Sequence, residues 1–216
     1  MDFSTIKSLY IPQGEVVKIS TPTGVLWQKK TPYTELEYLN LDGAVWFNTK
    51  YYGNLETKIE AKWQRANDTE YMYVYGCAST GSTASITAYS NGMWRFGSAG
   101  ETQSTFSTTL FTSTHDKNRI LRNNSNTPYD PTPSGDFKTP YPIAVAGGTS
   151  ASGLVPKESR FKGKYYYFKI WDDGELVIDW IPVTYEGVNG FWDKVTNTFV
   201  PPITSESIPT TLSEEE

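Results

Sequence analysis

The stretch from Gly163 to Val200, GKYYYFKIWDDGELVIDWIPVTYEGVNGFWDKVTNTFV, decides the fold class of this chain. Aromatic and β-branched residues dominate it, and these residue types favour the pleated surface of a β-sheet. The pair Asp173-Gly174 supplies the positive φ angles of a tight turn. The sequence therefore predicts a β-hairpin with strands at 164–172 and 176–183.

The sequence before this hairpin also predicts strands and turns, with no convincing helix. Residues 56–63 alternate polar and less polar side chains, as a half-buried strand does. A second hairpin is predicted from strands at 85–90 and 93–96, turned at Asn91-Gly92. The prolines that begin at Pro128 indicate a surface loop, and a buried strand is expected to follow at 143–146.

The chain is predicted to have three parts. Residues 1–32 form a small N-terminal β-meander, residues 33–202 form the main domain, and residues 203–216 form an acidic Ser/Thr/Pro-rich tail. Three short strands cannot bury enough apolar surface to stand alone. The first part is therefore expected to dock on the main domain, on a sister chain or on a larger assembly. The residues expected to make this attachment are Ile6, Ile11, Val17, Ile19 and Trp27.

Composition excludes several classes of function. The formal net charge is −5 and no Lys/Arg cluster stands out, so neither nucleic acid nor a membrane surface is an expected partner. The single cysteine, Cys77, rules out an intrachain disulfide. The single histidine, His115, lies in a polar stretch and is predicted to be a solvated loop residue. No metal site and no cofactor are expected.

The N-terminal sequence bears on where the protein is made. The first 20 residues have no apolar core of the kind a signal peptide needs. No apolar run approaches the length of a membrane-spanning helix. Synthesis in the cytoplasm without the usual export route is therefore expected.

The segment at 163–177 resembles the penultimate hairpin of a concanavalin A-like (laminin-G-like) sandwich, in the variant common in phage and gut-bacterial surface proteins. In that family the hairpin runs into a strand like Asp179-Trp180-Ile181-Pro182-Val183. A turn like 190–196 follows it, and the opening at 38–49 is similar too. The resemblance implies an all-β, concanavalin A-like jelly-roll β-sandwich. It also implies that the ring systems within the motif belong to the core: Trp171, Trp180 and Trp192.

The N-terminal part has a separate resemblance. The run from Ile11 to Trp27 looks like the leader segments of phage structural proteins. Together the two resemblances imply a virion structural protein: a capsid decoration, a head fibre or a tail-associated protein. Its partners would be other virion proteins and further copies of itself. The alternative is a bacterial carbohydrate-binding or adhesion module.

The same superfamily contains glucanases, which need closely spaced carboxylates on one strand. The nearest approach is Glu35-Leu36-Glu37, which lacks the further acidic residues of the family pattern. The acidic residues at 172–175 fall at a hairpin turn, where they are expected to diverge into solvent. No run has the Asp/Asn spacing of a calcium loop either. The sequence predicts a protein that is not an enzyme, and a hydrolase is the least favoured alternative.

Glycan binding is the function that the resemblance implies. Aromatic faces cover the apolar face of a sugar ring, and polar side chains bind its hydroxyls. Strand alternation predicts that Tyr71, Tyr73 and Tyr75 share one face, opposite Met72 and Val74. The alternative is that one of these stripes is the inter-sheet core. The candidate glycan-binding residues are Tyr71, Tyr73, Tyr75, Tyr89, Trp94 and Arg95.

Overall fold

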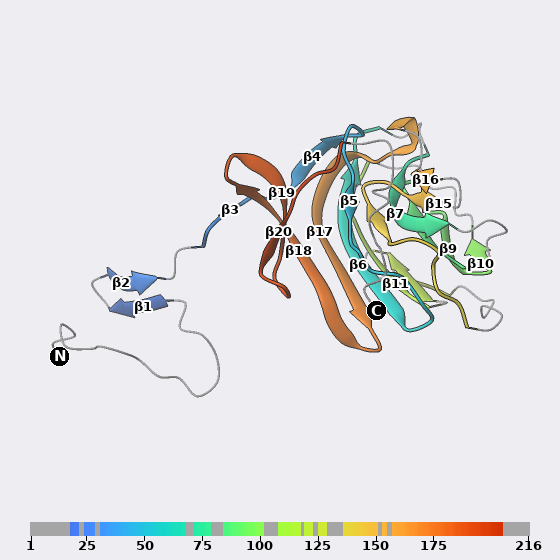
Figure 1. Cartoon of the computed structure of the whole chain (residues 1–216), viewed down its shortest axis with the longest axis horizontal. Coiled ribbons are helices and arrows are strands. Elements are labelled where there is room, and N and C mark those ends of the chain that lie inside the picture. Colours follow the sequence, from blue (N-terminus) through green and yellow to red (C-terminus); the bar gives the residue numbers. More distant parts are fainter. Residues whose placement is uncertain are drawn as a thin grey trace, which may run out of the picture. The chain divides into compact units, whose positions relative to one another are not determined.

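The chain forms two compact units, Met1–Thr34 and Glu35–Glu216 (Figure 1). In the first unit, β1 (Lys18–Thr21) pairs antiparallel with β2 (Gly24–Gln28), and Ile19 lies opposite Trp27. The expected strand at Ile6–Ile11 and the attachment residue Val17 lie outside the described residues. The computed structural model describes residues 18–21, 24–28, 31–67, 71–78, 84–101, 108–117, 119–122, 125–128, 136–150, 153–154 and 157–204.

The second unit contains a large antiparallel sheet with the strand order β13-β12-β11-β6-β17-β18-β19-β20, and β4 also pairs with β17. The short strand β3 (Thr34–Glu35) lies at the boundary between the units. The strands of the large sheet are β4 (Leu39–Asp42), β6 (Thr57–Arg65), β11 (Phe111–Asp116), β12 (Arg119–Arg122), β13 (Ser125–Pro128), β17 (Lys162–Asp172), β18 (Glu175–Tyr185), β19 (Val188–Asp193) and β20 (Thr198–Val200).

A second sheet has the order β10-β9-β8-β7-β14-β5, and β15 pairs with β7 and β16. Figure 1 shows these strands as a layer beside β6, β11 and β17. A short 3-10 helix, η2 (Lys157–Ser159), precedes β17. The strands of the second sheet are β5 (Phe47–Asn48), β7 (Tyr73–Ala78), β8 (Ser85–Tyr89), β9 (Trp94–Gly97), β10 (Ala99–Glu101), β14 (Ala144–Val145), β15 (Thr149–Ser150) and β16 (Gly153–Leu154).

Aromatic side chains from both sheets meet in one core. The rings of Tyr75 and Phe168 lie 5.6 Å apart across the sheets, and those of Phe47 and Phe191 lie 4.7 Å apart. β6 buries every second residue, as its alternation predicts. The all-β sandwich is therefore confirmed, while its membership of the concanavalin A-like family stays a prediction.

Both predicted hairpins are present, although their turns differ. Asp173 and Gly174 have φ angles of 48° and 81°, as a two-residue turn requires. At the second hairpin only Gly92 has a positive φ, and its amide donates to the Tyr89 carbonyl at 3.0 Å. That arrangement is a turn closed by one left-handed glycine, so the prediction that Asn91 also has a positive φ is wrong.

A glycine allows β17 to cross close to β6. Gly163 has a φ of 144°. A Cβ atom at this position would lie 2.8 Å from the Cα of Arg65 and closer still to the carbonyl oxygen of Gln64. Only a residue without a side chain fits here, because real Cβ atoms do not approach backbone so closely.

Two sequence predictions are wrong about burial. His115 is not a loop residue: it lies in β11 with 1% of its surface exposed. It faces inward because the alternation of β11 buries Phe111, Ser113 and His115 together. Trp171, expected in the core, is half-buried beneath the Lys58 ammonium, 5.2 Å from its ring. Its neighbour Ile170 takes the inward position.

Candidate functional site

The structure does not gather the six candidate glycan-binding residues on one surface. Tyr71 is exposed, at 55% of its surface, whereas Tyr75 and Trp94 are buried, at 0% and 2%. The rings of Tyr75 and Trp94 therefore pack in the core and offer no face to a sugar. The predicted role of these two residues is corrected accordingly.

A β-bulge explains why Tyr73 and Tyr75 lie on different faces. Tyr73 lies opposite Tyr89, but Tyr75 lies opposite Ala88, so the register shifts between them. Ala88 and Tyr89 are adjacent in β8, and adjacent side chains of a strand point to opposite faces. The prediction that Tyr73 and Tyr75 share one face is therefore wrong. It assumed regular alternation, and the bulge between the two residues breaks that alternation without any mark in the sequence.

Three of the candidates do share the outer face of the second sheet. The rings of Tyr73 and Tyr89 lie 4.3 Å apart. Arg95 lies opposite Thr87, two residues before Tyr89 on β8, and so projects from the same face. Burial raises the pKa of Tyr89, so its phenol stays neutral. This face is covered in part, since only 9% of Tyr89 is exposed.

The second unit has a cavity at another place, lined by described residues. A cavity of about 610 Å³ opens between the segment after β5, the turn from β19 to β20, and the chain that follows β20. This volume falls in the range of roughly 300–1,000 Å³ found for small-molecule sites. Its lining residues are Asn48, Thr49, Lys50, Trp180, Asp193, Thr196, Thr198, Phe199, Val200, Pro201 and Ile203.

One wall of this pocket is held by a local turn after β5. The Asn48 side-chain oxygen accepts a hydrogen bond from the Lys50 amide at 2.8 Å. Lys50 has a φ of 58°, a left-handed conformation that the asparagine contact supports. The Thr49 hydroxyl donates to the Ile143 carbonyl at 2.7 Å. These contacts place the amide of Asn48 and the stem of Lys50 at a fixed part of the pocket.

The opposite wall is organised by Asp193 at the end of β19. Its Oδ1 accepts hydrogen bonds from the Asp179 and Val195 amides, both at 3.1 Å. Its Oδ2 accepts from the Thr196 hydroxyl at 2.9 Å. Thr196 and Thr198 hydroxyls lie 2.7 Å apart, and since the Thr196 proton points to Asp193, Thr198 is the donor of that pair.

The apolar part of the pocket comes from the core and from the chain after β20. Trp180 is 2% exposed, and no described residue offers a hydrogen-bond partner to its Nε1. Ile203 holds the outgoing chain in place, because its amide and carbonyl pair with those of Trp46 at 2.8 and 3.0 Å. The pocket thus combines an aromatic ring, aliphatic side chains and several polar groups.

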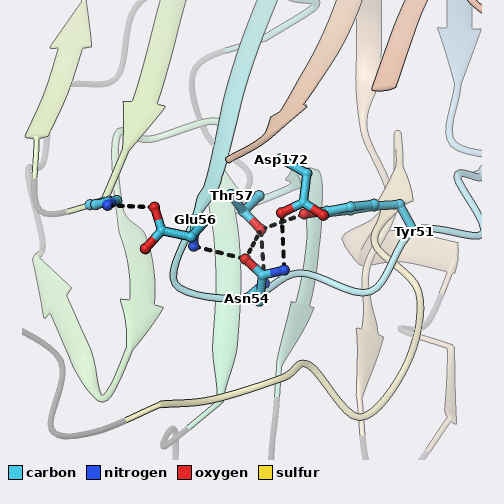
Figure 2. Close-up of polar contacts among 6 residues, drawn as sticks. Tyr51, Asn54, Glu56, Thr57 and Asp172 are labelled. Atoms are coloured by element: carbon cyan, nitrogen blue, oxygen red, sulfur yellow. Dashed lines mark hydrogen bonds and ion pairs between the residues drawn. The ribbon is translucent and has the colours of Figure 1, made fainter. Parts of the chain in front are cut away.

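A separate polar cluster closes the loop before β6 (Figure 2). The Asn54 side chain accepts from the Glu56 amide at 2.7 Å and donates to Asp172 at 3.1 Å. The Tyr51 hydroxyl lies 2.9 Å from that of Thr57. Asp172 is therefore bound to this loop and does not diverge into solvent as expected. Burial raises the pKa of Tyr51 to about 12, so its phenol remains protonated at neutral pH.

The pocket residues were present in the sequence motifs, but only as markers of the fold. Asn48 is the second-last residue of the opening segment at 38–49, and Asp193 lies in the turn motif at 190–196. Sequence reasoning assigned neither of them a binding role. Both motifs contain several polar residues, so nothing in the sequence singles out Asn48 or Asp193.

The described residues offer neither a grouped metal site nor a membrane-spanning helix. Among the described residues, no three His, Cys, Asp or Glu side chains are grouped as a metal site would need. In the same part of the chain, no helix has both the length and the apolar character to cross a bilayer. Comparisons of the sequence with family models and with curated proteins found no match.

Proposed function

We propose that this protein is a non-enzymatic, lectin-like virion structural protein whose sandwich domain binds a sugar in the pocket lined by Trp180 and Asp193. The pocket itself is the observation that carries the sugar-binding part. It joins the partly exposed ring of Phe199 with amide, hydroxyl and carboxylate groups around a volume of about 610 Å³. A pyranose needs this pairing, because it has an apolar face and a rim of hydroxyls.

The size and exposure of the polar groups fit a small, weakly held ligand. A pocket of this volume accommodates one or two sugar residues. Thr198 and Lys50 are exposed at the rim, and Asp193 is buried in the wall. A ligand would therefore meet flexible groups first and fixed groups deeper in the site.

The virion part of the proposal rests on the two resemblances in the sequence. The N-terminal unit would attach the protein to a capsid or tail partner, and copies of the chain would associate there. The sandwich would then present its pocket to glycans outside the particle. A bacterial adhesion module would share the pocket and would differ in the partner of the N-terminal unit.

Sugar binding is tested by titrating the full chain with a panel of methyl glycosides and following its amide NMR spectrum. Thr198→Trp would fill the rim of the pocket, whereas Thr108→Trp places the same ring at an exposed position outside it. We expect millimolar binding of at least one glycoside, weakened at least tenfold by Thr198→Trp and unchanged by Thr108→Trp. The absence of binding across the panel would refute the proposal.

Attachment is tested by deleting residues 1–30 and measuring incorporation into particles. We expect incorporation to be lost while the β-sheet circular dichroism and cooperative unfolding of the sandwich are retained. Normal incorporation of the shortened chain would contradict an attachment role for Ile6, Ile11, Val17, Ile19 and Trp27.

A further inference from the structure

We infer that the ligand of this pocket carries a carboxylate, as an acidic sugar such as a uronic acid does. The inference rests on the proposed sugar-binding function and adds the chemical class of the ligand. It follows from the hydrogen bonds that the polar groups of the pocket already make within the protein. Those that remain unpaired are donors, and one of them is a cation.

The acceptor groups and hydroxyl protons are already used within the protein. Both carboxylate oxygens of Asp193 accept hydrogen bonds, three in total from two amides and the Thr196 hydroxyl. The Thr198 proton is directed to Thr196, and the Thr49 proton is directed to the Ile143 carbonyl. The negative charge of Asp193 is therefore largely compensated before any ligand arrives.

The donor groups remain available. Asn48 uses its side-chain oxygen for the Lys50 amide. Within the described part of the chain, its Nδ2 has no acceptor, and the Lys50 ammonium has no carboxylate partner. Both residues line the pocket. A donor amide beside a cation is the pairing that binds a carboxylate, because each hydrogen bond to an ionised acceptor is charge-assisted.

Trp180 lines the inner wall without adding a donor for the ligand. Its Nε1 has no hydrogen-bond partner among the described residues, but it is closed off from solvent and therefore from a ligand oxygen. Asn48 and Lys50 thus present the available donors of this cavity, whereas the one carboxylate that lines it already accepts three hydrogen bonds.

The test compares ligands that differ only at the acidic group. Methyl β-glucuronide and methyl β-glucoside, and the corresponding galacturonide and galactoside, are titrated into the full chain at low and high salt. The Trp180 indole resonance, assigned by its loss in Trp180→Phe, reports occupancy of the pocket. We expect at least one uronide to bind about tenfold more tightly than its neutral partner and to weaken at high salt.

Matched variants locate the effect. Lys50→Gln should reduce the preference for the uronide to about twofold or less, while Lys157→Gln, the same charge change at an exposed residue outside the pocket, should leave it unchanged. Equal binding of neutral and acidic partners, or a preference that Lys50→Gln leaves intact, would overturn this inference and leave sugar binding standing. If no glycoside of either kind binds, the proposed function fails with it.

Discussion

The hydroxyl of Tyr75 lies 3.5 Å from Nδ1 of His115, in the buried layer between the two sheets. The edge of the Phe96 ring packs against the same imidazole, with centroids 5.4 Å apart. Nε2 of His115 has no hydrogen-bond partner in the part of the chain that the structure describes. This environment suits a neutral imidazole and opposes a charged one, so burial lowers the pKa of His115 to about 4.

The pKa of His115 predicts that the protein loses stability in mild acid. The unfolded chain takes up the proton near the usual pKa of about 6.5, whereas the folded chain resists until about 4. Stability should therefore be constant above that range and fall as the pH drops from about 6.5 towards 4. The loss attributable to this residue is about 3 kcal/mol. Urea unfolding at pH 7, 6 and 5 measures it.

His115→Gln provides the control for this prediction. The variant cannot titrate here, so the pH dependence that remains comes from other groups. We expect the variant to be less stable at pH 7 but to have a flatter profile between pH 6.5 and 4.5. Parallel profiles for the two proteins would show that His115 does not set the acid response.

Gly163 and Gly174 offer a matched pair for testing the close approach of β17 to β6. Both have positive φ angles, but a Cβ at Gly174 meets nothing within 4 Å, whereas one at Gly163 collides with the β6 backbone. Gly174→Ala should cost about 1–2 kcal/mol from its backbone conformation alone. Gly163→Ala should cost roughly 3 kcal/mol or more. Chemical denaturation of both variants measures these losses in the free energy of unfolding. Equal losses would mean that β17 can move away from β6 at little energetic cost.

Asp193→Asn tests the wall of the pocket without changing its size. An amide can still accept from the Asp179 and Val195 amides, but its nitrogen cannot accept from the Thr196 hydroxyl. We expect a loss of about 1–3 kcal/mol, measured by denaturation. Asp136→Asn, at an exposed residue outside the pocket, should change stability by less than about 0.5 kcal/mol. If Asp193→Asn left the free energy of unfolding unchanged, the carboxylate would not be what holds this wall.

Cys77 gives a chemical probe of the second sheet. It is the single cysteine, lies in β7 and has no exposed surface. Burial raises the pKa of its thiol, which further lowers the reactive thiolate fraction. A thiol reagent should therefore label the folded protein only through opening of the sheet, with a rate that rises in urea. Immediate labelling under native conditions would contradict the placement of β7.

The hairpins were predictable because their causes are local. Asp173-Gly174 and Asn91-Gly92 favour turns in almost any context, and the flanking strands follow from residue type. The burial of His115 was not predictable, since β11 turns serine and histidine inward, where hydropathy alternation expects apolar residues. The bulge between Tyr73 and Tyr75 likewise leaves no mark in the sequence.

The pocket could not be predicted from the sequence, because its lining comes from segments that lie far apart in the chain. Asn48 ends the early strand β5 and Lys50 follows it, while Asp193 and Thr198 belong to the last hairpin of the sandwich. Only the pairing of distant strands brings these residues around one cavity. Local patterns identify each residue as a turn or strand residue, and the sequence contains no signal of which distant turns will meet.

The pairing of Trp46 with Ile203 has a consequence for how the protein comes into being. Ile203 follows every described strand of both sheets, and the pocket wall at 196–203 is synthesised after β19 and the strands before it. A nascent chain halted at residue 195 would already contain almost the whole aromatic core but would lack half of its pocket. Under the proposed function, ligand recognition therefore depends on the turn before β20 and on the chain that follows it, whereas most of the aromatic core is built without them.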